Sequence, residues 1–171
     1  MTGQEPDRVY YMDEIYDLVG FKGKGLLFPR DFGIETHGRS TNCHRGYIMR
    51  YKIVEDSLKL DGFWFNSNND DFLLINGVKP IKISEETAKQ GEYIQSLFEY
   101  EYKNIDMIMN FRGNLLLAKD FIRSQYVHMG FQSSSAYKTV LKIDFKDGLV
   151  VNMEDKSKEA KKVRKKGKRR I

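Results

Sequence analysis

Apolar and polar residues alternate along most of the chain after residue 20, which is the pattern of half-buried β-strands. Residues 47–54 alternate apolar with basic side chains, and residues 57–65 place Leu58, Leu60 and Trp64 on one face. Turn-forming residues, Glu55, Asp56 and Ser57, lie where the two runs meet. The pattern therefore predicts a β-hairpin.

Further hairpins are predicted from tight-turn dipeptides. Asn76-Gly77 joins FLLI to VKPIKI, and Asp147-Gly148 joins VLKIDF to LVVNM. Residues 98–102 alternate as another strand, and the run IDMIMNF continues to a turn predicted at Gly113-Asn114 before LLLA. A short helical turn is expected to open at Ser84 and to end before Gly91.

The first twenty residues follow a different period. Tyr11, Ile15, Leu18 and Val19 recur at helical spacing over residues 8–19, with acidic residues opposite and Gly20 behind them. This spacing predicts a short N-terminal amphipathic helix.

These elements give the expected fold class. About nine or ten strands in roughly 130 residues, with turn signals between them, predict a mainly β domain over residues 1–153. Strands placed beside their sequence neighbours form an antiparallel meander. Closure would remove two exposed edges, so the meander is expected to close into a calycin-like barrel.

The charge is concentrated at one end of the chain. Of the 171 residues, with a net charge of +5, residues 154–171 hold ten Lys or Arg against three acids. Such a segment repels itself and offers little for burial, so residues 154–171 are predicted to be a disordered basic tail. Flexible cations attract phosphate backbones, so this tail predicts non-specific nucleic-acid binding, with a solubilising extension as the alternative. The candidate residues are Lys161, Lys162, Arg164, Lys165, Lys166, Lys168, Arg169 and Arg170.

The apolar runs, the start of the chain and the cysteine content indicate where in the cell the protein is expected. No apolar run reaches the roughly 18 residues of a membrane span, and the start lacks the pattern of a secretory signal, so no membrane partner is expected. The one cysteine, Cys43, cannot form an internal disulfide. These features favour a cytoplasmic protein.

Reactive side chains are densest in residues 37–47, just before the first long strand. Extending the alternation of Tyr47 backward places Cys43 and Arg45 on the same apolar face. A buried arginine needs an anion or several acceptors, so Arg45 predicts either a bound carboxylate or phosphate or a structural pair with an internal acid. The remaining alternative is a loop in which the alternation fails.

A second cluster lies at residues 118–131. There Tyr126 and His128 are expected to share one strand face, and His128 is a candidate acid or base with Arg45 as its anion-binding partner. The alternative is a partly exposed histidine without a catalytic role. The three histidines and Cys43 lack the spacing of familiar zinc motifs, so no metal and no cofactor is expected.

Three stretches together resemble a known family. Residues 41–60, 75–81 and 115–137 are similar to a family of uncharacterised, mostly bacterial proteins with a Thr-x-Cys-Trp-Arg-Gly-Tyr stretch and a later Tyr-Val-His-Met-Gly run. The resemblance covers roughly residues 25–153 and implies no activity. His44 stands where that family has tryptophan. The positions it singles out are Thr41, Cys43, Arg45, Gly46, Tyr47, Gly113, Tyr126, His128, Gly130 and Tyr137.

Three functional hypotheses follow. The first is a β-barrel that binds a small molecule or a protein partner through Cys43, Arg45, Tyr47, Tyr126 and His128. The second is an enzyme acting on an anionic small molecule with Arg45 and His128. The third is an RNA- or ribosome-associated protein held by its basic tail. The sequence does not determine the oligomeric state.

Overall fold

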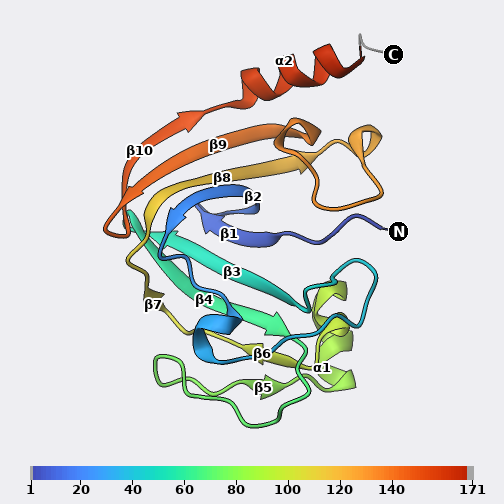
Figure 1. Ribbon diagram of the computed structural model, residues 1–171, viewed down its shortest axis with the longest axis vertical. Helices are drawn as coiled ribbons and strands as arrows, with labels where there is room; N and C mark the ends of the chain where they lie inside the picture. The colour runs from blue at the N-terminus through green and yellow to red at the C-terminus, as the bar shows by residue number, and fades with distance from the viewer. Residues whose placement is uncertain (1, 169–171) are drawn as a thin grey trace.

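The computed structural model describes residues 2–168, in which strands make up 43% and helices 19% of the chain, so the predicted mainly β class is confirmed. The helical part of the described residues comprises the α-helices α1 (Glu85–Gln90) and α2 (Ser157–Lys168) and four short 3-10 helices, and Figure 1 shows α2 along the top of the sheet and α1 at its lower right. The strands are β1 (Asp7–Tyr11), β2 (Glu14–Lys24), β3 (Tyr47–Val54), β4 (Ser57–Phe65), β5 (Ile81–Lys82), β6 (Tyr100–Tyr102), β7 (Met107–Ile108), β8 (Arg112–Phe121), β9 (Tyr137–Lys146) and β10 (Leu149–Asp155).

Seven strands of the sheet form a ring. Their order is β10, β9, β8, β2, β1, β3 and β4, and a single residue pair, Leu149 with Ser57, joins β10 back to β4. Strands β6 and β5 continue outward from β4, and β7 pairs with another part of β4. Figure 1 shows this curvature, with β8 to β10 above β1 to β4.

The predicted meander is wrong in several places: β6 rather than β5 pairs with β4, β7 also pairs with β4, and two pairings near the N-terminus differ. Strand β1 pairs with β3 in parallel, and β2 pairs with β8, which follows it by about ninety residues. Strand β2 pairs with β8 along one edge of the β1–β2 hairpin, so β1 pairs with β3 along the other edge. Proximity in sequence therefore does not decide these two pairings.

The predicted N-terminal helix is also wrong, because residues 7–24 form the β1–β2 hairpin. Val9 pairs with Tyr16 and both are buried, while Met12 and Asp13 adopt positive φ angles of 49° and 62° in the turn. Two short alternating runs that meet at a turn can imitate helical spacing. The β-branched and aromatic residues of this segment favour the strands that form.

Two predicted hairpins are confirmed. Glu55 and Asp56 form the turn between β3 and β4, and Asp147-Gly148 forms the turn between β9 and β10, each with two positive φ angles. The predicted helical turn is α1, where the Ser84 hydroxyl accepts a hydrogen bond from the backbone of Thr87. These elements have local causes that the sequence displays.

Two other predicted turns differ. Asn76-Gly77 does form a turn, but the chain before it is irregular apart from an isolated bridge between Ile75 and Val78. Gly113 lies inside β8, opposite Gly23 of β2, so the predicted turn at Gly113-Asn114 is wrong. A Cβ atom at Gly113 would lie 1.9 Å from the backbone oxygen of Lys22, so this residue permits a close approach of two strands.

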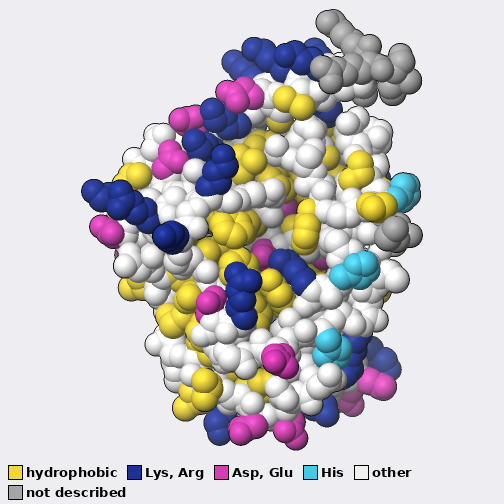
Figure 2. Space-filling view, in the orientation of Figure 1, with side chains coloured by type: hydrophobic (Ala, Val, Ile, Leu, Met, Phe, Trp, Pro, Cys, Tyr) yellow, Lys and Arg dark blue, Asp and Glu magenta, His cyan; other side chains and the backbone are white. Residues whose placement is uncertain are grey.

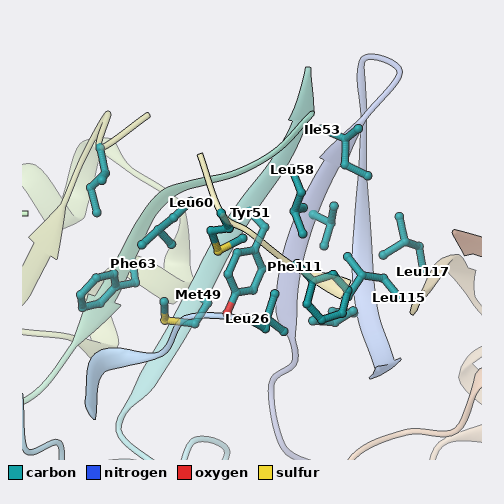
Figure 3. Close-up of a cluster of buried hydrophobic side chains, with 14 of the residues drawn as sticks. Leu26, Met49, Tyr51, Ile53, Leu58, Leu60, Phe63, Phe111, Leu115 and Leu117 are labelled. Carbon is teal, nitrogen blue, oxygen red and sulfur yellow. The ribbon is translucent and has the colours of Figure 1, made fainter. Parts of the chain in front are cut away.

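Side chains fill the inside of the ring. Figure 3 shows this cluster, in which the Tyr51 hydroxyl donates a 2.7 Å hydrogen bond to the backbone oxygen of Leu27. Core side chains thus occupy the interior of the ring, and the pockets described below open at the surface. The labelled members are Leu26, Met49, Tyr51, Ile53, Leu58, Leu60, Phe63, Phe111, Leu115 and Leu117.

The basic C-terminal segment is ordered where the structure describes it, contrary to the predicted disorder. Residues 154 and 155 end β10, and α2 follows and contacts β9. Ala160 is buried, and the Arg164 guanidinium donates 2.8 Å hydrogen bonds to the backbone oxygens of Ser135 and Tyr137. Lysine, alanine and glutamate are strong helix formers, and these contacts hold the helix in place.

In the described residues, neither helix is long and apolar enough to cross a bilayer.

Candidate functional site

The two predicted clusters lie together at one end of the ring, on the right in Figure 1. The N-terminal segment, residues 2–6, runs between them. Its Glu5 amide donates to the backbone oxygen of Asn42, and its Gln4 amide donates to that of Gly130, both at 2.8 Å. The Tyr126 hydroxyl accepts from the Gly3 amide at 2.6 Å. Residues 41–47 and 126–137 thus belong to one structural feature.

Arg45 forms an ion pair with Asp7 at this end. Its two terminal nitrogens donate to the two carboxylate oxygens at 2.6 and 3.1 Å, and one also donates to the backbone oxygen of Glu5. Its guanidinium lies over the rings of Tyr47 and Phe131, at 4.5 and 5.3 Å from their centroids. Burial alone would lower the pKa of Arg45, but the Asp7 carboxylate raises it above its usual value. A free anion would have to compete with Asp7.

Cys43 lies in a different environment from Arg45. Its Sγ donates to the backbone oxygen of Tyr47 at 3.4 Å, and the thiol packs beside Ile48 and Trp64 rather than in the main core. The predicted shared face is wrong because the chain turns at Gly46 before β3 begins. Burial raises the pKa of Cys43, so the thiol stays protonated and is a weak nucleophile at neutral pH.

His128 is exposed on the loop that follows β8. The strand ends at Phe121, so the predicted strand face that would carry Tyr126 and His128 does not form. The two rings nevertheless pack edge to face with centroids 4.9 Å apart. A catalytic role for His128 remains a prediction.

A pocket of about 370 Å³ lies beside the N-terminal segment, and we call it the carboxylate pocket. Its acidic groups are Glu5 and Asp17, and the Tyr137 hydroxyl donates a 2.8 Å hydrogen bond to Asp17. The lining consists of Thr2, Gly3, Gln4, Glu5, Pro6, Asp17, Asn42, Phe121, Tyr126, Gln132 and Tyr137.

The electrostatics of this pocket favour the neutral acids. Burial raises the pKa of Glu5, and the charge of Asp17 raises it further. Burial likewise raises the pKa of Asp17, which the hydrogen bond from Tyr137 and the charge of Arg8 oppose. Among the described lining residues, none is Lys or Arg. A ligand with a positive charge would therefore stabilise the ionised carboxylates.

Sequence reasoning singled out Tyr126 and Tyr137 but missed Glu5 and Asp17. Glu5 lies in a segment without periodicity, and Asp17 was assigned to the polar face of a helix. An alternating strand pattern for residues 14–20 would have placed Asp17 opposite the buried Tyr16 and Leu18.

Metal ligands do not gather in the part of the chain that the structure describes, where no three His, Cys, Asp or Glu side chains form a group that could hold an ion. His37 instead accepts a 3.2 Å hydrogen bond from Arg39.

Helix α2 carries a basic face. Lys158, Lys161, Lys162, Lys165 and Lys166 are exposed and follow one side of the helix, opposite Ala160 and Arg164, which face the sheet. Figure 2 shows basic side chains along the top of the molecule, where α2 lies. Arg164, a predicted nucleic-acid contact, is instead bonded to backbone oxygens. Lys168 ends the helix, and Arg169 and Arg170 lie outside the described residues.

A scan against protein-family models matches none, and searches of curated proteins and of solved structures find no significant match.

Proposed function

We propose that this chain is a small-molecule-binding protein in which a calycin-like barrel carries the carboxylate pocket at one end. The observation that supports it is the pairing of two partly buried acids, Glu5 and Asp17, with aromatic rings in a pocket of about 370 Å³. Pockets of this size and mixed lining are typical of small-ligand sites.

The charge of the pocket selects the ligand class. A primary or secondary amine brings a positive charge to Asp17 and Glu5, while Phe121 and Tyr126 supply apolar and cation–π surface for its carbon chain. Burial raises the pKa of both acids, and a cationic ligand favours their ionised forms, so binding displaces a proton in the pH range where either acid is protonated. Binding is therefore expected to strengthen as the pH rises through the titration of these acids.

Native mass spectrometry of freshly purified protein would first detect a ligand that remains bound. Calorimetric titration with short alkyl diamines then tests the class. We expect saturable binding that Asp17→Asn weakens at least tenfold, because removal of one charge-assisted hydrogen bond costs roughly 1.5–3 kcal/mol. Asp13→Asn, in the exposed β1–β2 turn, is the matched control and should bind as the wild type does. Equal binding by both variants would contradict the proposal.

The basic face of α2 favours a second candidate function, the binding of nucleic acid through phosphate contacts. The five exposed lysines, listed above, follow one side of a helix that is fixed to the body through Arg164. A fixed row of cations contacts a phosphate backbone without reading its sequence.

Charge reversal on this face separates the two functions. The variant Lys161→Glu/Lys165→Glu should weaken binding to a single-stranded RNA and reduce the slope of log K against log salt. The matched control Lys22→Glu/Lys24→Glu changes the same charge at the exposed end of β2 and should leave the slope unchanged. Unaltered RNA binding by the α2 variant would exclude the helix as the contact surface.

A further inference from the structure

A second pocket, which we call the Trp64 pocket, lies on the outer side of β1, β3 and β4 and has a volume of about 260 Å³. Its lining includes Arg8, Arg50, Trp64, Glu92 and Glu101. It is separate from the carboxylate pocket, and the two share none of their described lining residues.

Two arginines stand side by side on this surface. Arg8 of β1 is the register partner of Arg50 of β3, and their guanidinium carbons lie 5.5 and 4.1 Å from the ring centroid of Trp64. Like charges at directly opposed positions of neighbouring strands repel each other. An anion placed between the arginines would relieve this repulsion.

Local structure makes room for Arg50. The β3–β4 register shifts between Arg50 and Tyr51, and Gly62 lies opposite Arg50. A Cβ atom at Gly62 would lie 2.5 Å from the Arg50 guanidinium and 2.2 Å from the Tyr102 backbone oxygen. One terminal nitrogen of Arg50 donates to that oxygen at 3.0 Å and pairs with Glu101 at 2.8 Å.

Two donors in this pocket have no acceptor within the described residues. They are the indole Nε1 of Trp64 and the second terminal nitrogen, Nη1, of Arg50, and both are buried. Trp64 is only 6% exposed. A buried donor without an acceptor costs roughly 1–3 kcal/mol, so two in one place indicate a missing acceptor.

The charged side chains of the pocket restrict the charge that the missing acceptor can carry. Arg8 pairs with Glu92 at 2.6 Å, and Glu101 pairs with Arg50 and lies 3.8 Å from Lys103. Burial lowers the pKa of Arg50 despite Glu101 and Asp61, whereas Asp7 raises that of Arg45. The lining holds three basic residues, Arg8, Arg50 and Lys103, against three acidic ones, Asp61, Glu92 and Glu101, so an added acceptor fits with one negative charge better than with two.

We propose that the Trp64 pocket binds the carboxylate group of a small organic acid, whose two oxygens accept hydrogen bonds from Trp64 Nε1 and Arg50 Nη1. Two oxygens match two donors, and a single charge is the smallest that an anion can add to this balanced lining. The Glu92 side chain that holds Arg8 over the indole is 59% exposed. Such pairs contribute about 0–1 kcal/mol, so Arg8 can move aside to admit the ligand at little cost.

The chain contains one tryptophan, so one indole N–H resonance reports on this pocket alone. In ¹⁵N-labelled full-length protein, titration with sodium acetate and then sodium benzoate should move that resonance downfield to saturation. Sodium chloride at equal ionic strength should not. The absence of a saturable shift, or a shift with inorganic phosphate and none with either carboxylate, would overturn the proposal.

Variants locate the binding contact. Arg50→Lys keeps the charge but loses the planar donor fork, so we expect affinity for benzoate to fall about tenfold. Arg112→Lys makes the same change at an exposed position of β8 and should leave affinity unchanged. If Arg50→Lys fails to fold, Trp64→Phe with ligand-observed NMR tests the indole contact and should lower affinity by a similar factor. Unchanged affinity in the folded variant would contradict the assignment.

Discussion

Asp7 and Arg45 join β1 to the loop before β3 through two side-chain hydrogen bonds of 2.6 and 3.1 Å. The same carboxylate accepts a 2.7 Å hydrogen bond from the Met49 amide in β3. Asp7 thus fixes the start of the parallel β1–β3 pairing. It also occupies the Arg45 nitrogens that could otherwise bind an external anion.

Breaking this pair from the arginine side should be costly. Arg45→Met leaves the Asp7 carboxylate buried without its partner, so we expect the free energy of unfolding to fall by about 3–5 kcal/mol in urea denaturation. Asp7→Asn/Arg45→Met should recover part of this loss because no unpaired charge remains. Arg39→Met removes the more exposed pair with Glu99 and should cost under about 1 kcal/mol. A loss at Arg45 no larger than at Arg39 would refute a structural role for the pair.

The raised pKa of Asp17 predicts the sign of a pH effect. Burial raises this pKa in the folded state, so the folded protein binds more protons than the unfolded chain between the ordinary and the raised values. This term therefore stabilises the fold as the pH falls through that window and is lost as the pH rises above it. Asp17→Asn keeps an acceptor for Tyr137 but cannot titrate.

The measurement is the difference in free energy of unfolding between Asp17→Asn and the wild type from pH 7 down to pH 4. Relative to the variant, the wild type should gain stability on acidification. A relative loss would reverse the predicted sign.

The β1–β2 turn offers a stabilising substitution. Met12 adopts a positive φ of 49° and its side chain is 74% exposed, so it gains little from packing. Asparagine tolerates this conformation better than methionine, and we expect Met12→Asn to raise the thermal midpoint of unfolding by about 1–2 °C, which corresponds to roughly 0.5 kcal/mol. Met12→Ala removes the same side chain without the conformational gain and serves as the control. Equal midpoints for the two variants would show that the turn conformation is not limiting.

The contact between α2 and the sheet can be disrupted locally. Ala160 is buried against the sheet side of the helix, so Ala160→Lys should release residues 157–168. Hydrogen exchange should then accelerate across α2 and remain slow in β8 and β9. Lys161→Asp, on the exposed side, is the control for changing a helix residue. Uniformly slow exchange in Ala160→Lys would mean that the helix is not held by this contact.

Local signals in the sequence explain which elements were predicted. Hairpins β3–β4 and β9–β10 have alternating faces and turn residues that adopt positive φ, so their causes are contained in short segments. The N-terminal hairpin was missed because Met12-Asp13 carries no strong turn signal and the flanking apolar residues imitate helical spacing. Composition also overstated disorder in α2, whose strong helix formers contact β9.

The candidate sites depend on long-range pairings that no local pattern contains. Asp17 meets Tyr137 across the β2–β8–β9 part of the ring, and Arg8 meets Arg50 through the parallel pairing of β1 with β3. Predicting either contact requires the strand order first. For Arg45, one of the expected partners, an internal acid, is present as Asp7. This could be expected without the strand order because a buried guanidinium must have a partner whichever fold surrounds it.

The closure of the ring has a consequence for synthesis of the protein. The β1–β4 half can pair as soon as about 65 residues have left the ribosome, but β2 awaits β8, and Ser57 awaits Leu149. Until β6, β7 and β8 have left the ribosome, the outward edges of β2 and β4 therefore stay open to unwanted partners. Nascent chains halted near residue 100 should accordingly be more prone to aggregate and to recruit chaperones than chains halted after residue 160, which pulldown of stalled ribosomes can measure.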